Sequence, residues 1–146
     1  MKHLLVACIL ALNGLGIAHS QSQLQQSHNE ANVPEAAAFE RILQRDLLDH
    51  VKSRRAQTAS RVQYSLLRDA PTQSGTAYPK FYAWVKFYAG KELIAQGAVR
   101  AAAVQKTRFD VTHFLDAATI RSNPEALSNI FPAALVPAII QQAKAA

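Results

Sequence analysis

The sequence predicts an α+β fold in which an N-terminal helix packs on an antiparallel sheet of three or four strands and a proline-broken helical segment follows. Apolar residues first recur at helical spacing, between residues 33 and 55. They then alternate with polar residues between residues 61 and 115, and they return to a helical pattern that Pro132 and Pro137 interrupt. This succession of periods indicates a single α+β domain over residues 33–146.

The first predicted helix begins after Asn32 and ends near Arg55. Pro34 falls in its first turn, where the missing N–H is not needed. Asn32 and Glu35 stand at the spacing of a capping box, so we expect the Asn32 side chain to cap this helix. The apolar face of the helix is formed by Phe39, Ile42, Leu43, Leu47 and Val51.

Four candidate strands follow the helix. They lie at residues 61–68, 80–89, 92–104 and 107–115. Gly90 and Lys91 suit the two central positions of a type II′ hairpin turn. With that turn, Trp84 would lie opposite Gly97, an aromatic ring covering a glycine, although Gly97 could equally mark a β-bulge. A second tight turn is expected at residues 105–106.

The strongest strand signal is KFYAWVKFYA at residues 80–89, in which the tetrapeptide KFYA occurs twice, six residues apart. Because this spacing is even, both copies place equivalent residues on the same face of a strand. One face is apolar and must meet the helix. The other face carries Lys80, Tyr82, Trp84, Lys86 and Tyr88. We expect the C-terminal helices to cover this second face in part, and an uncovered stripe would be the best ligand-binding surface of the chain.

The C-terminal segment predicts two short helices, at about 124–130 and 133–143. Asn123 is a candidate N-cap, and Pro124 suits the first helical position. Pro132 forbids one continuous helix. The apolar face of this segment is formed by Ile130, Phe131, Leu135, Ile139 and Ile140.

Residues 1–20 are typical of a secretory signal peptide, because Lys2 precedes an apolar run that ends in small residues. The run is shorter than the about 20 apolar residues of a membrane-spanning helix, and an uncleaved N-terminal anchor is the alternative. Cleavage after Ser20 removes the only cysteine, Cys8, and leaves a mature chain with no thiol, disulfide or transmembrane segment. The Gln-rich residues 21–32 then form a flexible leader.

The mature chain is therefore expected in a periplasm or outside the cell, and its Ala-rich composition favours a bacterial source. Cleavage removes one Lys and no acidic residue, which lowers the formal net charge from +6 to +5. The densest basic cluster, Lys52 with Arg54 and Arg55, suits the negative end of the helix dipole. Basic residues on neighbouring predicted strands are Lys80, Lys86, Lys91, Arg100 and Arg108. Beside aromatic residues they could make weak contact with an anionic envelope polymer, whereas export makes nucleic acid the least favoured partner.

The sequence contains no motif that binds a metal ion, a phosphate group or a cofactor. His28, His50 and His113 are not at metal-ligand spacing, and H-E-x-x-H, G-x-S-x-G and glycine-rich phosphate loops are absent. We therefore expect no metal and no cofactor. The lack of a catalytic motif favours a protein that is not an enzyme.

One pair of residues could nevertheless support catalysis. Asp46 and His50 are four residues apart on the first helix, a spacing at which a carboxylate can orient an imidazole and raise its pKa. The favoured interpretation is a half-buried histidine whose ring forms a hydrogen bond with the nearby carboxylate and has no catalytic role. Tyr64 and Arg100 could converge on the pair, although an Arg in an Ala-rich strand more simply marks a closely packed helix. His113 alternates with apolar residues and is expected to border the core.

The order of helix, antiparallel strands and broken helix resembles that of the cystatin-like and NTF2-like folds. Similarity to NTF2-like enzymes implies that Asp46 and His50 would lie in a pocket between helix and sheet. Inhibitory cystatins carry a Q-x-V-x-G hairpin, which residues 96–99 (QGAV) do not match, so protease inhibition is not implied.

Three functions stay open. The favoured one is a non-enzymatic module that binds a protein partner or ligand through its sheet. The others are an NTF2-like lyase or isomerase that uses the Asp–His pair, and a basic, aromatic surface that binds an envelope polysaccharide or another anionic polymer. The candidate ligand-binding residues are Tyr82, Trp84, Lys86, Tyr88 and Arg100.

Overall fold

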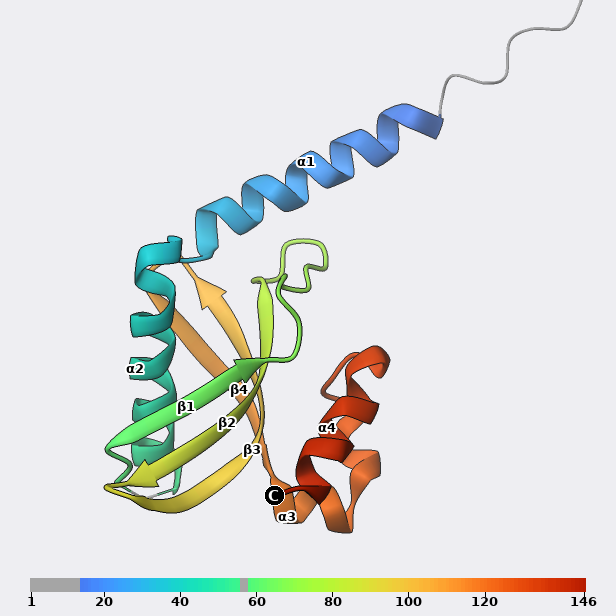
Figure 1. Cartoon of the computed structure of the whole chain (residues 1–146). Coiled ribbons are helices and arrows are strands. Elements are labelled where there is room, and N and C mark those ends of the chain that lie inside the picture. Colours follow the sequence, from blue (N-terminus) through green and yellow to red (C-terminus); the bar gives the residue numbers. More distant parts are fainter. Residues whose placement is uncertain (1–13, 56–57) are drawn as a thin grey trace, which may run out of the picture.

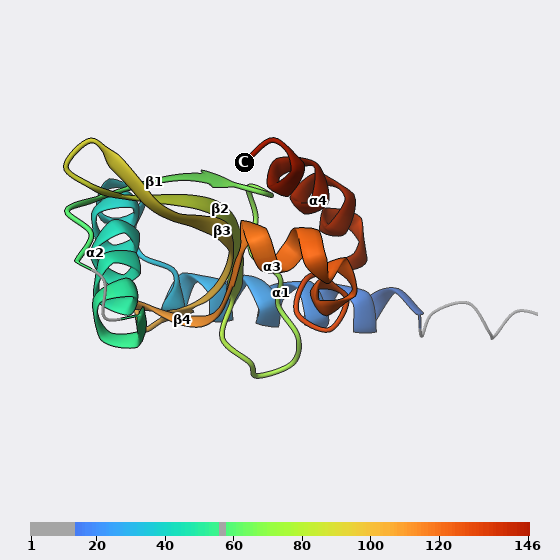
Figure 2. The same cartoon turned by 90° about the horizontal axis from the view of Figure 1, so that it is seen from below.

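The computed structural model describes residues 14–55 and 58–146 and confirms the α+β fold (Figure 1). Four antiparallel strands form one sheet in the order β1-β2-β3-β4. The strands are β1 (Arg61–Leu66), β2 (Lys80–Ala89), β3 (Glu92–Val104) and β4 (Arg108–Asp116). Helix α2 (Ala36–Arg55) lies along one side of the sheet, whereas α3 (Ala117–Ser122) and α4 (Val136–Lys144) lie on the other side (Figures 1 and 2).

Helix α1 (Gly14–Asn32) projects away from the sheet (Figure 1). The backbone of residues 21–32 is therefore helical, whereas the Gln-rich composition predicted a flexible leader. Gln, Ala and Glu are good helix formers, and the Gln26 side chain donates a hydrogen bond to Glu30 one turn later (Nε2 to Oε1, 3.1 Å). None of the described helices is both long and apolar enough to span a membrane.

The predicted signal peptide falls largely outside the part of the chain that the structure describes. Residues 1–13, which include Lys2 and Cys8, precede the described residues. Export and cleavage after Ser20 therefore stay predictions.

Asn32 ends α1 instead of capping α2, so the predicted capping box is wrong. The Asn32 amide donates to the backbone oxygen of His28 (2.9 Å) and accepts from the backbone N–H of Gln105 (3.1 Å). Its backbone oxygen accepts from the N–H of Lys106 (2.8 Å), and the Glu35 carboxylate binds the Lys106 ammonium (2.7 Å). The turn between β3 and β4 thus takes the groups that would have capped the helix, and it fixes the start of α2 to the sheet.

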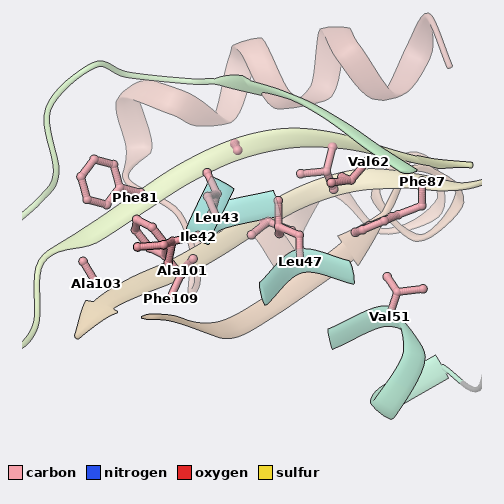
Figure 3. Close-up of a cluster of buried hydrophobic side chains, with 13 residues drawn as sticks. Ile42, Leu43, Leu47, Val51, Val62, Phe81, Phe87, Ala101, Ala103 and Phe109 are labelled. Carbon is pink, nitrogen blue, oxygen red and sulfur yellow. The ribbon is translucent and has the colours of Figure 1, made fainter. Parts of the chain in front are cut away.

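The first core lies between α2 and one face of the sheet (Figure 3). Leu47, Val51 and Phe87 are completely buried. Around Phe39, three phenylalanine rings from α2, β2 and β4 meet edge to face with centroids 5.0 to 5.7 Å apart. The predicted apolar faces of the helix and of the KFYAWVKFYA strand are confirmed. The core is formed by Ile42, Leu43, Leu47, Val51, Val62, Phe81, Ala83, Val85, Phe87, Val99, Ala101, Ala103 and Phe109.

A second core lies between the opposite face of the sheet and the C-terminal helices. Its buried residues are Tyr82, Trp84, Ala98, Ala117, Ile120, Leu127, Phe131, Ile139 and Ala143. Since β2 contributes to both cores, its residues from Phe81 to Val85 are all buried. The sheet is therefore the central layer of the molecule in this region.

A β-bulge changes the register of the β2–β3 hairpin. The two-residue turn forms as predicted, with a positive φ of 61° at Gly90. Beyond it, Ile94 is an extra residue on β3 without a partner on β2, and every later pair shifts by one. Trp84 consequently lies opposite Ala98, so the predicted pairing of Trp84 with Gly97 is wrong.

A second bulge lies in β4, where Thr112 has no partner on β3. Strict alternation predicted that Val111, His113 and Leu115 share a face. The extra residue splits this set, because Val111 packs against the first core whereas Leu115 packs against the second. His113, two residues from Leu115, lies on the side of the C-terminal helices.

The chain continues directly from β4 into α3, a helix that the sequence analysis did not predict. The Asp116 carboxylate caps α3 by accepting hydrogen bonds from the backbone N–H (2.9 Å) and the hydroxyl (3.0 Å) of Thr119. Two short 3-10 turns, Pro124–Leu127 (η1) and Ala133–Leu135 (η2), connect α3 to α4 and confirm the proline-broken segment. Among the described residues, Asn123 makes no side-chain capping bond, so that predicted cap is wrong.

Gly97→Ala is expected to be severely destabilising. A Cβ at this position would lie 2.0 Å from the backbone oxygen of Leu115 and 2.7 Å from Cα of Asp116. Because backbone atoms cannot move aside by a rotamer change, we expect the free energy of unfolding in urea to fall by about 3 kcal/mol.

Gly90→Ala is the matched control for this substitution. A Cβ at Gly90 would meet nothing within 4 Å, and only the positive φ of 61° opposes it. The cost should be about 1 kcal/mol. Equal losses in the two variants would contradict the close contact between β3 and β4.

Candidate functional site

Two of the five predicted ligand-binding residues are covered by the C-terminal helices. Tyr82 and Trp84 are only 4% and 3% exposed. The Tyr82 ring contacts the ring of Phe131 (centroids 6.0 Å apart), and its hydroxyl shares a 2.7 Å hydrogen bond with the hydroxyl of Thr72. Neither side chain is accessible to a ligand, so both are removed from the candidate site. Their burial holds the C-terminal helices on the sheet.

Arg100 has a structural role as well. Its guanidinium donates to the backbone oxygen of Ile130 (Nη1, 3.2 Å), to the hydroxyl of Thr112 (Nε, 3.0 Å) and to Nδ1 of His113 (Nη2, 2.8 Å). The three bonds join β3, β4 and the segment between η1 and η2. Arg100 therefore fixes the C-terminal segment against the sheet, and its donors are not aimed at an open pocket.

The remaining two predicted residues, Lys86 and Tyr88, are on the same sheet face as Tyr82 and Trp84 but nearer the β2–β3 turn, where Lys86 is exposed and Tyr88 is half-buried. The hairpin end of β2 and β3 extends beyond the C-terminal helices (Figure 2). Cross-strand pairing places Arg61 and Leu93 on either side of Tyr88, and Gln63 beside Lys86. We call these five residues the open sheet face.

The open sheet face is preorganised around one aromatic ring. The Arg61 guanidinium lies 4.0 Å from the centroid of the Tyr88 ring, and the Tyr88 hydroxyl donates to Oε1 of Gln63 (3.0 Å). Leu93, on the other side of the ring, is 42% exposed, one of three large apolar side chains that are exposed among the described residues. A cation, a ring and an exposed aliphatic group thus form one surface on three strands.

Asp46 and His50 do not form the predicted pair. The Asp46 carboxylate accepts a hydrogen bond from the backbone N–H of Phe109 (2.6 Å) and one from Nε of Arg45 (2.8 Å). Among the described residues, no hydrogen bond joins Asp46 to the His50 ring. Asp46 therefore attaches α2 to the edge strand β4, and it does not serve as the orienting carboxylate of a general base. Tyr64 packs against the first core and Arg100 binds elsewhere, so the predicted convergence of these four side chains does not occur.

His50 instead lines an open groove of about 580 Å³ between the C-terminal end of α2 and β4. The other lining residues are Arg54, Arg55, Val111, Thr112, His113, Phe114 and Asp116. We call this site the cationic groove. The Arg55 guanidinium lies over the Phe114 ring (4.9 Å to the centroid) and 3.9 Å from the carboxylate of Asp116, which already caps α3.

Burial and neighbouring cations lower the pKa of both histidines in the cationic groove. Partial burial is the larger cause at His50, and the charges of Arg54 and Arg55 add to it. At His113 burial again comes first, and the charge of Arg100 adds to it. Both imidazoles therefore stay neutral in the folded protein at pH values where the unfolded chain would begin to protonate them. A general base that needs a raised pKa is not assembled here.

Sequence reasoning missed several residues of both surfaces. The hairpin turn alone would have placed Leu93 opposite Tyr88, but Arg61 and Gln63 became neighbours only through the pairing of β1 with β2, across a loop whose geometry the sequence does not specify. Arg54 and Arg55 were assigned only to the helix dipole. Their proximity to β4 follows from the packing of α2, which no local pattern encodes.

The chain matches no family model, no curated protein and no solved structure. Within residues 14–55 and 58–146, no group of three or more His, Cys, Asp or Glu side chains could hold a metal ion.

Arg100→Met tests the attachment of the C-terminal segment. The substitution keeps a long side chain but removes three hydrogen bonds from a charged donor, so we expect stability to fall by about 2 to 3 kcal/mol. Hydrogen exchange should accelerate in α3 and α4 before it does so in α2. Arg61→Met, an exposed change on β1, should stay within about 0.5 kcal/mol of the parent. Uniform acceleration of exchange throughout the chain would contradict this role of Arg100.

Asp46→Ala separates a structural role from a catalytic one. Loss of the bond to the Phe109 N–H should lower the free energy of unfolding by about 1 to 2 kcal/mol. The pKa of His50, followed by NMR, should stay below its ordinary value and should not change, because Asp46 does not set it. A further fall of the His50 pKa in this variant would show that Asp46 does raise that pKa, as the predicted Asp–His pair requires.

Proposed function

We propose that the protein is an exported, non-enzymatic domain that binds a protein partner through the open sheet face. The observation that carries this proposal is the unequal cover of one side of the sheet. Tyr82 and Trp84 lie beneath the C-terminal helices, whereas Lys86, Tyr88 and Leu93 extend the same side beyond them.

The chemistry of the open sheet face supports a protein partner. Tyrosine and arginine are enriched at the centres of protein interfaces, where their large surfaces bury at a low cost in conformational entropy. Tyr88 is held in place by Arg61 and Gln63 before any partner arrives. Leu93 offers an apolar anchor beside it. Arg61 and Lys86 favour a partner whose complementary surface is acidic at its rim.

Export is part of the proposal and is supported by the sequence of residues 1–20, with a basic residue before an apolar run that ends in small residues. The alternative function as an NTF2-like enzyme depended mainly on an Asp46–His50 pair. Asp46 instead binds the backbone of β4, so this pair no longer supports it.

Photo-crosslinking tests the open sheet face directly. A benzophenone amino acid at Leu93 should join the protein to one defined partner in the envelope or culture medium of the source organism. The same probe at Tyr78 should give no such product. Tyr78 is 43% exposed and is therefore as accessible as Leu93. The Leu93 product should be lost on adding Lys86→Glu and kept on adding Lys144→Glu.

Three results would contradict the proposal. Crosslinking of equal yield from Leu93 and Tyr78 would indicate nonspecific contact. Capture of polysaccharide alone, abolished by moderate salt, would favour the anionic-polymer function instead. A Lys86→Glu protein that keeps its partner would show that binding occurs elsewhere on the molecule.

A further inference from the structure

The cationic groove is a second surface that the open sheet face does not explain. His50, Arg54 and Arg55 come from the last turns of α2, and His113 comes from β4. Two elements far apart in the sequence thus bring two guanidinium groups and two imidazoles to one depression. We propose that this groove binds a small organic anion, a carboxylate or phosphate ester with an apolar body.

Among the residues that line the groove, positive charge exceeds negative charge, whereas Asp46, Asp49 and Asp110 line the adjoining depression, which shares His50 and Arg54. Asp116 is the one acidic residue in its lining, and that carboxylate already accepts two hydrogen bonds from Thr119. Its distance to Arg55 is 3.9 Å, longer than a hydrogen bond. Within the described residues, the Arg54 side chain makes no ion pair or hydrogen bond. Guanidinium groups in this state present their forked donors to a carboxylate or phosphate.

The helix dipole does not account for the whole arrangement. Cations in the last turn of α2 favour the dipole wherever their side chains point. That explanation covers Arg54 and Arg55 but not His113, which reaches the groove from β4 and whose Nδ1 is held by Arg100. Burial is the larger cause of the lowered pKa of both histidines; the charges of Arg54 and Arg55 add to it at His50, whereas the charge that adds to it at His113 is that of Arg100, outside the groove lining. An anion in the groove would oppose the field of Arg54 and Arg55 and raise the pKa of His50.

The groove also has an apolar wall and sufficient size. Val111 and Phe114 line it beside the cations, and its volume of about 580 Å³ falls within the range of small-molecule sites. Arg55 covers one side of the Phe114 ring, with its guanidinium carbon 4.9 Å from the ring centroid. An inorganic ion would use only the cations. An organic anion would use the wall as well, and for that reason we assign the groove to an organic anion.

An NMR titration with benzoate, inorganic phosphate and the uncharged isostere benzamide tests the assignment. Benzoate should shift the signals of His50, Arg54 and Arg55 with a Kd below about 10 mM, in the range expected of a fragment. It should also raise the pKa of His50. Phosphate should bind more weakly than benzoate, and benzamide should produce no saturable shift.

A pair of double variants provides the control. Arg54→Gln/Arg55→Gln should weaken benzoate binding at least about tenfold, the change expected when a charged hydrogen-bonding partner is removed. Lys91→Gln/Lys144→Gln removes the same net charge from exposed positions elsewhere and should bind as the parent does. Unchanged backbone amide spectra outside the groove show that both variants are folded.

Several outcomes would overturn the assignment. A benzamide response equal to that of benzoate would show that charge is not recognised, and stronger binding of phosphate than of benzoate would show that the wall is not used. Equal weakening of benzoate binding in the two double variants would show that the effect comes from the net charge of the protein alone. The proposal is independent of the open sheet face, because Lys86→Glu should leave benzoate binding intact.

Discussion

Burial of β2 on both of its faces is the constraint on which the rest of the structure depends. Five consecutive residues from Phe81 to Val85 have at most 5% of their surface exposed, so each side of the strand needs an apolar layer. Large aromatic side chains remove about 150–250 Å² each from water, at about 25 cal/mol per Å². Each ring therefore outweighs a hydrogen bond, which contributes about 1 kcal/mol. The apolar contacts hold α2 and the C-terminal helices on the sheet, and polar contacts such as those of Arg100 fix where they lie.

The cover that the two layers provide is unequal, and this inequality creates the candidate surfaces. Helix α2 has 20 residues and follows the sheet along its length, whereas α3, which α4 packs against, starts where β4 ends at Asp116. The C-terminal layer therefore covers Tyr82 and Trp84 but not the hairpin end of the same face. The residues beyond the cover are those that tolerate water, Lys86 and Tyr88, so the strand changes from core to surface without breaking its alternation.

The elements that depend on local periodicity could be predicted from the sequence, and those that depend on competition between distant groups could not. Alternation placed Phe87 in the first core correctly because a strand has a fixed period of two. It failed at Ile94 and Thr112, where an extra residue reverses the faces and no composition marks the bulge. The Asn32 cap failed for another reason. The turn at Gln105 presents a backbone N–H to the same amide, and that turn is 73 residues away in the chain.

The same competition between local and distant partners decides the environment of Asp46 and His50. On an isolated helix, Asp46 and His50 would be suitable partners, and an exposed ion pair at this spacing contributes about 0.3–0.5 kcal/mol. The edge strand β4 offers Asp46 a backbone N–H that otherwise lacks a partner, and a hydrogen bond to a charged group contributes about 1.5–3 kcal/mol. Because the hydrogen bond to the strand is the stronger of the two interactions, Asp46 binds Phe109 and His50 is left among arginines. Packing of the helix on the sheet thus converts a possible acid–base pair into a structural carboxylate and a neutral imidazole in a positively charged groove. That change of environment favours recognition of an anion over transfer of a proton.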